Sequence, residues 1–340
     1  MNQLHGAILT KDGFKNGYIT VNEQESSTLH VYNKSSTHET QLMIPLLFNA
    51  HTHIGDTFVR KKNIPLPKDI QQLVAPPNGL KHQLLRTTKS TEIINGMIQG
   101  LKELKTNGIS TFIDFRENGI HGLSMIHQAL QKIPVDSLLL GRPTGLDVTT
   151  KEIDDILKVS DGIGLSSVQD WDYDLAVLIA EKTKKKNKFF AFHASECERD
   201  PIKPILDLKP DFIVHMAKAS KQDLLQVKQH HIPLVVCPRS NQFFGLKPNI
   251  QAMHDIGNMI VLGTDNFMLH PPNILNEIKW IQHHFPRLYT LEELLLMNTY
   301  QARTIFLKKE YTGEQLPSSW MVLNAQTFRI KTIVHDVKPA

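Results

Sequence analysis

Eight short apolar segments alternate with helical patterns through the middle of this chain, and this alternation limits the possible folds more than any other feature. The segments are rich in β-branched and aromatic residues, which is typical of buried parallel strands. They span residues 44–49, 109–115, 137–141, 162–166, 188–193, 211–216, 232–237 and 259–265. Helical periodicity lies over residues 91–106, 123–132, 172–186, 220–230 and 274–284, and a further helix is expected over 291–307. Eight strands, each followed by a helical or probable helical stretch, predict an α/β protein with a (β/α)8 TIM barrel. The fifth unit is the weakest, since only a short helix fits after residues 188–193.

An open, doubly wound sheet is the alternative arrangement for such a pattern. That fold binds dinucleotides through a glycine-rich turn after its first strand. No G-x-G-x-x-G motif follows any of the eight segments, so the barrel is the preferred prediction.

The two ends of the chain have residue patterns that are typical of strands and show no helical period. Residues 1–43 hold three strand-like stretches separated by turn signals, and the residues from about 313 onward are similar. Chain ends often lie close together in folded domains. We therefore expect residues 1–43 and 313–340 to form one small composite β-sandwich, and residues 44–312 to form the barrel.

Composition excludes several classes of protein. The chain of 340 residues is 41% hydrophobic, which is enough for a large core. Its net charge of +4 is too small and too dispersed to indicate a nucleic-acid partner. The two cysteines, Cys197 and Cys237, allow neither a disulfide framework nor a CxxC metal site. With no signal peptide or membrane-length apolar run, we expect a cytoplasmic protein without membrane contact. Whether it forms a homo-oligomer is left open.

Metal-binding residue types stand where the predicted strands end. His51 and His53 are two residues apart, so on a strand they share one face. Among 17 histidines such a pair is easily a coincidence. However, His193, His215 and Asp265 stand at the ends of the fifth, sixth and eighth strands, the edge where barrel enzymes place their active sites. Imidazoles with a carboxylate predict a divalent metal ion, Zn²⁺ first, with Fe²⁺ or Mn²⁺ as alternatives.

The stretches HTH, FHASE, VHM, CPRSN and GTDN, in this order, resemble the amidohydrolase superfamily. They are most similar to its one-metal branch of deaminases and chlorohydrolase-like enzymes, which is related to S-adenosylhomocysteine deaminase, guanine and cytosine deaminases and imidazolonepropionase. The resemblance covers nearly the whole chain. Two-metal members carry a bridging lysine on strand four, and GIGLSSVQDW has none, so one metal ion is expected.

The resemblance implies a role for each strand-end residue. It makes His51, His53, His193 and Asp265 the metal ligands, and it makes Glu196, His215 and Asp265 the catalytic groups. A bound metal ion lowers the pKa of its water to about 7, which provides hydroxide at neutral pH. Glu196 is then the general acid and base, and Asp265 accepts a proton. His215 either ligates the metal or hydrogen-bonds its water.

Substrate contacts are expected from residues after several other strands. Arg116, Arg142 and Arg239 fall at or just past the ends of strands two, three and seven, where guanidinium groups can grip a carboxylate or phosphate. The alternative is that each pairs with a neighbouring acid, such as Glu117. The remaining candidates are Trp171, which can stack on a planar ring or be structural, and Asn241, which is expected to shape the pocket.

The long stretch from Gly55 to Lys89 is the last expected element of the site. It exceeds an ordinary connection and contains five residues that favour rigid turns: Pro65, Pro67, Pro76, Pro77 and Gly79. Long loops at this edge of a barrel usually bind ligands or form lids.

These features predict hydrolysis of a non-peptide C–N bond in a small heterocyclic substrate. Deamination with release of ammonia is expected first, and opening of a cyclic amide or imidazolone, as in imidazolonepropionase, is the alternative. A non-catalytic homologue is the third possibility, but such a scaffold would be expected to have lost part of the ligand set.

Overall fold

The fold is described from a computed structural model, which covers residues 2–22, 27–32, 40–145, 148–309 and 317–339. It separates into two compact units, and each is described by itself. The first comprises residues 1–48, 106–110 and 274–340, and the second comprises residues 49–105 and 111–273. Among the described residues, no helix is long and apolar enough to cross a membrane.

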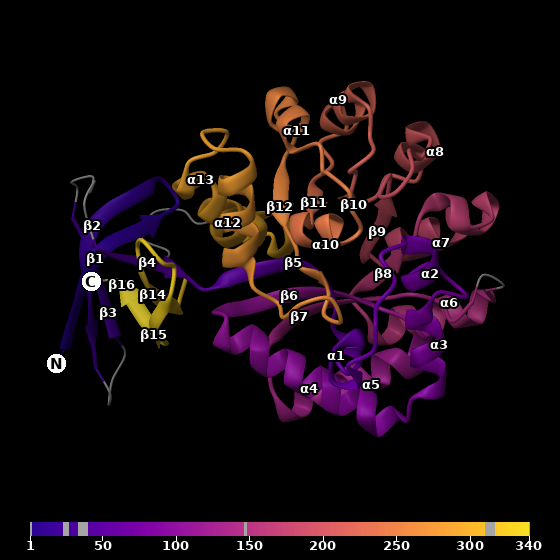
Figure 1. Ribbon diagram of the computed structural model, residues 1–340, viewed down its shortest axis with the longest axis horizontal. Coiled ribbons are helices and arrows are strands. Elements are labelled where there is room, and N and C mark those ends of the chain that lie inside the picture. The colour runs from indigo at the N-terminus through magenta and orange to yellow at the C-terminus, as the bar shows by residue number, and fades with distance from the viewer. Residues whose placement is uncertain (1, 23–26, 33–39, 146–147, 310–316, 340) are drawn as a thin grey trace. The chain divides into compact units, whose positions relative to one another are not determined.

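Strands from both chain ends form one mixed sheet in the first unit, with indigo and yellow strands together in Figure 1. The sheet order is β15-β14-β4-β1-β2-β3-β16. The strands are β1 (Asn2–Thr10), β2 (Gly13–Val21), β3 (Ser27–Val31), β4 (Gln41–Pro45), β14 (Trp320–Asn324), β15 (Ile330–Val334) and β16 (Val337–Pro339). Ile8, Met43, Trp320 and Val322 belong to its buried core. The expected sandwich is thus refined to a single seven-stranded sheet over these residues.

Three further helical segments belong to the first unit: α12 (Ile274–His284), α13 (Leu291–Leu296) and α14 (Ala302–Leu307). A π-helical turn, Met297–Gln301, interrupts the helix that was expected to run unbroken over residues 291–307. Tyr300 in this turn donates its hydroxyl to the carbonyl of Leu9 in β1 at 3.0 Å. The domain limits at 43/44 and 312/313 stay a prediction.

The second unit is organised on a curled parallel sheet, as the eight apolar segments predict. Its strands are β5 (Leu47–His53), β6 (Ile109–Arg116), β7 (Asp136–Gly141), β8 (Gly162–Leu165), β9 (Phe189–Ala194), β10 (Phe212–His215), β11 (Leu234–Val236), β12 (Ile260–Leu262) and β13 (Asp265–Asn266). The eighth segment is split in two. β12 pairs with β11, and β13 pairs with β5, so the sheet closes on its first strand.

Strand one begins later than expected. Residues 44 and 45 end β4 in the other sheet, and β5 starts only at Leu47. The backbone carbonyl of Leu46, between the two strands, accepts a hydrogen bond from the side chain of Arg303.

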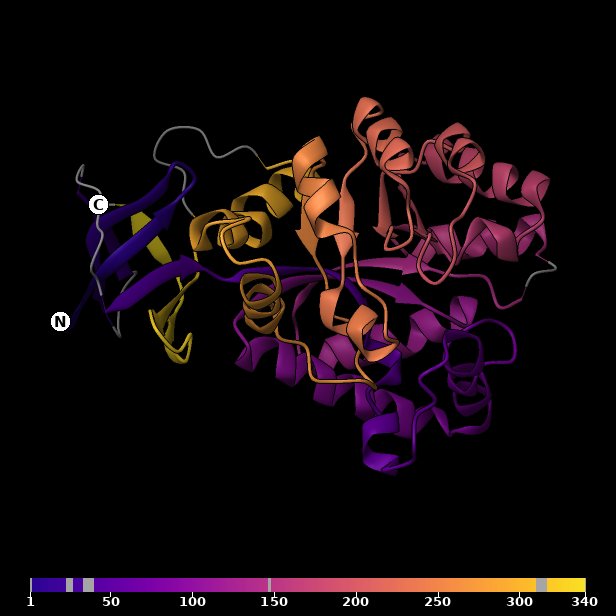
Figure 2. The same cartoon turned by 45° about the horizontal axis from the view of Figure 1, so that its top comes forward.

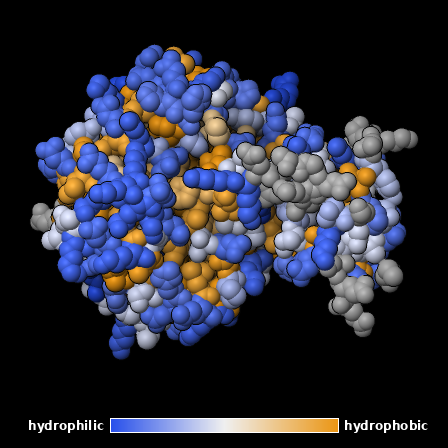
Figure 3. All heavy atoms as spheres, turned by 180° about the vertical axis from the view of Figure 1, so that it is seen from behind, coloured by the Kyte–Doolittle hydropathy of each residue, from blue (hydrophilic) through white to orange (hydrophobic). Residues whose placement is uncertain are grey.

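Helices lie outside the strands of this sheet, as the turned view in Figure 2 shows. The long ones are α4 (Ser90–Thr106), α5 (Gly119–Lys132), α6 (Thr150–Val159), α7 (Tyr173–Lys185) and α9 (Lys221–Gln229). The short ones are α1 (Val59–Lys62), α2 (Ile70–Leu73), α3 (Leu80–Thr87), α8 (Ile202–Asp207), α10 (Pro238–Phe243) and α11 (Ile250–Ile256). On the face shown in Figure 3, apolar areas lie between larger hydrophilic ones.

Helix α9 has a specific start signal. Ser220 and Asp223 form a capping box, and the Asp223 carboxylate also accepts two hydrogen bonds from Arg199, at 2.7 and 2.8 Å. The hydrogen bonds from Arg199 lower the pKa of Asp223 to about 2. The charged carboxylate is therefore the form that stabilises the fold.

We expect Asp223→Asn to lower the free energy of unfolding at pH 7 by about 1–2 kcal/mol, because it removes a capping acceptor and an ion pair. A lowered pKa means that this contribution is present above the ordinary value of 3.8 and is lost as pH falls toward 2. Urea unfolding at pH 7 and pH 3 measures both effects. The matched control is Asp207→Asn, which breaks an exposed pair with Lys203 and is expected to change stability by less than about 0.5 kcal/mol. If the free energies of unfolding of the two variants differed by the same amount at pH 7 and at pH 3, the stabilising role of the charged Asp223 would be contradicted.

Candidate metal centre

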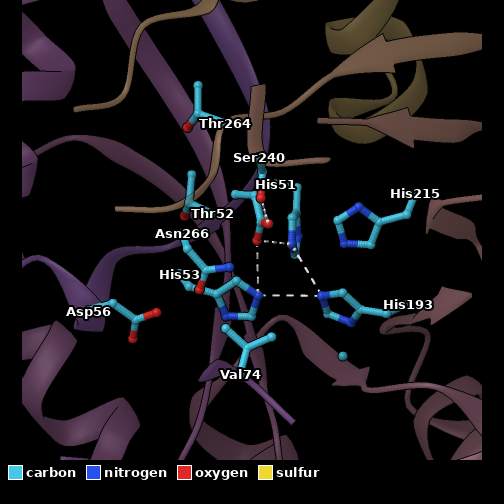
Figure 4. A network of polar contacts seen from close by, with 12 residues as sticks. His51, Thr52, His53, Asp56, Val74, His193, His215, Ser240, Thr264 and Asn266 are labelled. Carbon is cyan, nitrogen blue, oxygen red and sulfur yellow. Dashed lines mark hydrogen bonds and ion pairs between the residues drawn. The ribbon is translucent and has the colours of Figure 1, made fainter. Parts of the chain in front are cut away.

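The five residues predicted at strand ends meet at one edge of the curled sheet. His51 and His53 lie on β5, His193 on β9, His215 at the end of β10 and Asp265 on β13. All but His193 are less than 4% exposed. Figure 4 shows the rings of His51, His53 and His193 turned toward a common point, with His215 to one side.

The break in strand eight brings Asp265 to this point. Asn49 holds the break from β5: its amide donates to Thr264 Oγ1 at 2.7 Å and accepts from the Thr264 backbone N–H at 3.0 Å. Gly263 is needed because a Cβ atom there would lie 2.7 Å from His51 Cβ. Asn49 therefore has a structural role.

Several non-glycine residues of the site have left-handed backbone conformations. The φ angles are +48° at Ser195, +75° at His215, +54° at Met216 and +57° at Asp265. Such conformations are costly for residues with a side chain and concentrate at functional sites. Here they turn the chain at the ends of β9 and β10 and within the split eighth strand.

The converging atoms have the spacing of metal ligands. His193 Nε2 lies 3.2 Å from His51 Nε2 and 3.3 Å from His53 Nε2. Asp265 Oδ1 lies 3.2 Å from His51 Nε2 and 3.5 Å from His53 Nε2. In a tetrahedral zinc site with bonds of 2.0–2.1 Å, neighbouring ligand atoms lie about 3.3 Å apart. Two overlapping groups could hold a metal ion, His51 with His53 and His193, and His51 with His215 and Asp265; in each group the ligand atoms lie within 4.8 Å of one another.

The outer contacts of two histidines fix where their protons lie. His193 Nδ1 is 2.8 Å from the carbonyl oxygen of Leu165, and His53 Nδ1 is 2.7 Å from the Glu117 carboxylate. Both partners only accept hydrogen bonds, so each Nδ1 carries the proton and each Nε2 of a neutral ring presents a lone pair. Two lone pairs that face each other at 3.3 Å repel unless a cation lies between them.

Burial keeps these rings neutral. It lowers the pKa of His51 to about 4 and that of His53 to about 3. Burial and the neighbouring His51 hold the pKa of His193 well below its usual range. The Phe115 ring packs edge-on against His51 and His193, with centroids 4.6 and 4.8 Å away. Neutral imidazoles are the form that ligates metal ions.

Asp265 is the anionic member of the group. Its Oδ2 accepts a hydrogen bond from Ser240, and its Oδ1 faces the histidine nitrogens. Burial opposes ionisation, but the close His51 ring and the other surrounding histidines hold the pKa of Asp265 well below its usual range. The carboxylate is therefore available to a cation or a proton at neutral pH.

Glu196 and His215 form the other side of the site. Glu196 Oε1 lies 3.5 Å from His215 Nε2, and the Asn241 amide lies 3.5 Å from Glu196 Oε1 and 3.3 Å from His215 Nδ1. Burial raises the pKa of Glu196 to about 7, against the opposing effect of His215. Asn241 thus holds the two groups together.

The turn that carries Glu196 is fixed by Asp200. Its carboxylate accepts hydrogen bonds from the Ser195 backbone N–H and from the side chains of Ser167 and Gln169, the latter two at 2.7 Å. The loops after β8 and β9 are therefore joined directly beside the catalytic candidate.

A cavity opens onto these groups. Its described lining includes His53, His193, Glu196, His215 and Asp265, together with Ile70, Val74 and Pro76 of the long stretch after strand one. The long stretch thus contributes to the site rather than standing apart from it.

The predicted substrate contacts occupy different positions. Arg142 lines the cavity. Arg116 is buried and paired with Asp114 and Glu117, while Trp171 donates its indole N–H to Ser166 at 3.0 Å. Arg116, Trp171, Arg239 and Asn241 are not among the described residues that line the cavity. Substrate binding by these residues stays a prediction.

Two residues of the site, Glu117 and Lys81, were not predicted from the sequence. Glu117 contacts His53, but at the sequence level it looks only like a neighbour for Arg116. Lys81 is 2% exposed and lines the cavity, although lysines in long polar loops are usually solvated. The one available signal was the position of Glu117 just past the end of a strand.

The comparisons with known proteins agree with this arrangement. The model of the Amidohydrolase family matches residues 42–313. An uncharacterized protein of Methanocaldococcus jannaschii is 38% identical over 295 residues, covering 80% of this chain and 75% of the relative. The 5-methylthioadenosine/S-adenosylhomocysteine deaminase of Pyrococcus furiosus is 23% identical over 325 residues, covering 83% of this chain and 75% of the relative.

A solved structure shares the fold. The crystal structure of Helicobacter pylori aminofutalosine deaminase, in complex with methylthio-coformycin, covers 99% of both chains with a TM-score of 0.72 and 12% sequence identity. At that identity the likeness concerns the fold alone. The family match and the histidine-rich site together establish that this chain belongs to the amidohydrolase family.

Proposed function

We propose that this amidohydrolase deaminates a small heterocyclic amine and releases ammonia. The observation that carries the proposal is the position of Glu196. Its carboxyl lines the cavity, lies 3.5 Å from His215 Nε2, and comes from the turn that directly follows the strand of His193. A proton donor and acceptor beside a metal centre is what hydrolysis at a ring C–N bond requires.

His51, His53, His193 and Asp265 would hold the metal ion, and their nitrogen and oxygen ligands suit zinc, with iron or manganese as alternatives. When bound, a divalent ion supplies Lewis acidity that makes a water molecule ionise near neutral pH. The neutral histidines and the charged Asp265 are the protonation states that such binding needs.

The side chains of the protein then transfer the protons. Asp265 accepts one proton from the attacking water, and Glu196 donates one to the ring nitrogen beside the carbon that bears the amine. A new C–O bond forms at that carbon, and Glu196 takes back a proton from the added oxygen. The exocyclic C–N bond then breaks, and the amine leaves as ammonia with the proton that Asp265 took from the water. His215, held by Asn241, orients Glu196. The raised pKa of Glu196, about 7, means that its protonated form is present at neutral pH.

Similarity to deaminases supports this reaction over the opening of a cyclic amide. The Pyrococcus furiosus relative, which is 23% identical to this chain, is named a deaminase. That likeness does not identify the substrate.

The first test replaces Glu196 with glutamine. We expect the metal content to stay unchanged and turnover to fall by about 10²–10⁴-fold, because the proton carrier is lost. Ammonia release under saturating substrate measures the effect. Glu181→Gln, the same change on an exposed carboxyl of α7 that is not among the described residues lining the cavity, is the control and should keep turnover within about twofold, as surface changes usually do. Full activity of Glu196→Gln would refute its role.

The second test separates the two reactions. Amino-purines, amino-pyrimidines and cyclic amides are incubated with the purified protein, and ammonia is measured beside the loss of substrate. We expect ammonia in equal amount to the substrate consumed. Consumption of cyclic amides alone, without ammonia, would replace deamination by ring opening. No turnover of any compound class would favour a non-catalytic role.

The third test concerns the ligands. The protein as purified, or after incubation with Zn²⁺ and removal of the excess, is expected to retain about one divalent ion per chain by elemental analysis. His193→Asn removes one of the converging nitrogens and should retain much less. His127→Asn alters an exposed histidine on α5, whose Nε2 lies 2.9 Å from the Val159 carbonyl oxygen, and should bind zinc like the parent. Equal zinc in both variants would contradict the assignment.

A further inference from the structure

Lys81 is a lysine buried at a depth that lysines rarely reach. It lies on α3, in the long stretch after strand one, and is only 2% exposed. Its Nζ atom lies 2.6 Å from Glu117 Oε1 and 3.2 Å from Asp56 Oδ2, and it donates to Asn266 Oδ1 at 3.3 Å. A buried ammonium group is tolerated only when it is paired in this way.

The same Glu117 oxygen also contacts a ligand candidate. Glu117 Oε1 lies 2.7 Å from His53 Nδ1, while Oε2 is held by Arg116, which also contacts Asp114 at 3.3 Å. A carboxylate on the outer nitrogen of a ligating histidine fixes its tautomer and raises its basicity, and loss of such a partner typically weakens metal binding 10–100-fold. Glu117 is thus a positioning residue for His53.

Lys81 reaches the site by a second route. Asn266, which accepts its other hydrogen bond, directly follows Asp265 and pairs with His53 in the sheet. The Lys81 side chain therefore contacts both Glu117, which holds His53, and Asn266, which directly follows Asp265.

We propose that Lys81 makes the stretch 57–89 a working part of the metal centre, so that docking of this stretch and metal binding strengthen each other. This rests on the proposed metal site, not on the identity of the substrate. With Lys81 in place, Glu117 is held toward His53, and the buried carboxylates of Glu117 and Asp56 are both compensated. Without Lys81, Asp56 and Glu117 each lose a nearby cation, and Glu117 keeps Arg116 on its other oxygen. Glu117 is then no longer held firmly toward His53.

Linkage makes this proposal quantitative. If docking of the stretch strengthens metal binding by some factor, metal binding must favour docking by the same factor. Ile70, Val74 and Pro76 of this stretch line the cavity, so metal binding also favours a complete cavity wall.

The test uses Zn²⁺ as the probe and two readouts that do not depend on turnover. Zinc affinity is measured by competition with a chromophoric chelator, and docking is measured as the rate at which thermolysin cuts within residues 57–89, with and without zinc. For the parent protein we expect zinc to slow cleavage. For Lys81→Met we expect zinc affinity to fall about 10–100-fold and most of the protection by zinc to disappear.

Lys68→Met is the matched control, since Lys68 is an exposed lysine of the same stretch; it should behave like the parent. Glu117→Gln is a second variant that keeps an acceptor for His53 but removes the charge that pairs with Lys81. It should show reductions in both readouts, which keeps the proposal testable if Lys81→Met does not fold. Parent-like zinc affinity in Lys81→Met or Glu117→Gln, or unchanged protection by zinc, would overturn the proposal. Failure of the ammonia assay alone would leave these readouts intact and would bear on the reaction only.

Discussion

The central constraint of this structure is that hydrogen-bond acceptors face one another in a buried place. The Nε2 atoms of His53 and His193 present lone pairs at 3.3 Å, and Asp265 adds a carboxylate oxygen beside them. Buried polar groups are normally satisfied by donors. This arrangement is reasonable only as a site for a cation, and much of the neighbouring structure serves to keep it in place.

The supports of the site act from outside the ring of ligand candidates. The Leu165 carbonyl, the Glu117 carboxylate and the Ser240 hydroxyl each hold one of its members in orientation. Backbone strain is accepted in the same region, at Ser195, His215 and Asp265. A protein that only needed a stable barrel would gain from relaxed strand ends and apolar side chains here. The distribution of strain therefore points to chemistry rather than to stability.

The sequence predicted the part of this site that depends on strand periodicity. His51 and His53 share a face because strands repeat every two residues, and His193, His215 and Asp265 follow apolar runs that could only be strands. Lys81 and Glu117 could not be predicted, because they meet through a contact between residues far apart in the chain that leaves no local pattern. The short helices α1–α3 also escaped prediction, since four to eight residues are too few to show a helical period. The continuation of β4 to Pro45, the late start of β5 and the π-helical turn after Leu296 likewise depend on tertiary contacts, such as that of Arg303 with Leu46.

The split eighth strand has a consequence for the order in which the site is assembled. Asp265 belongs to the last strand of the sheet to be made, and this strand pairs with β5, the first. During synthesis the three histidines therefore exist together well before the carboxylate can join them. Until that strand is in place, the site has its histidine nitrogens without the carboxylate charge that would balance a cation. Occupancy of the centre would then report that the barrel has closed.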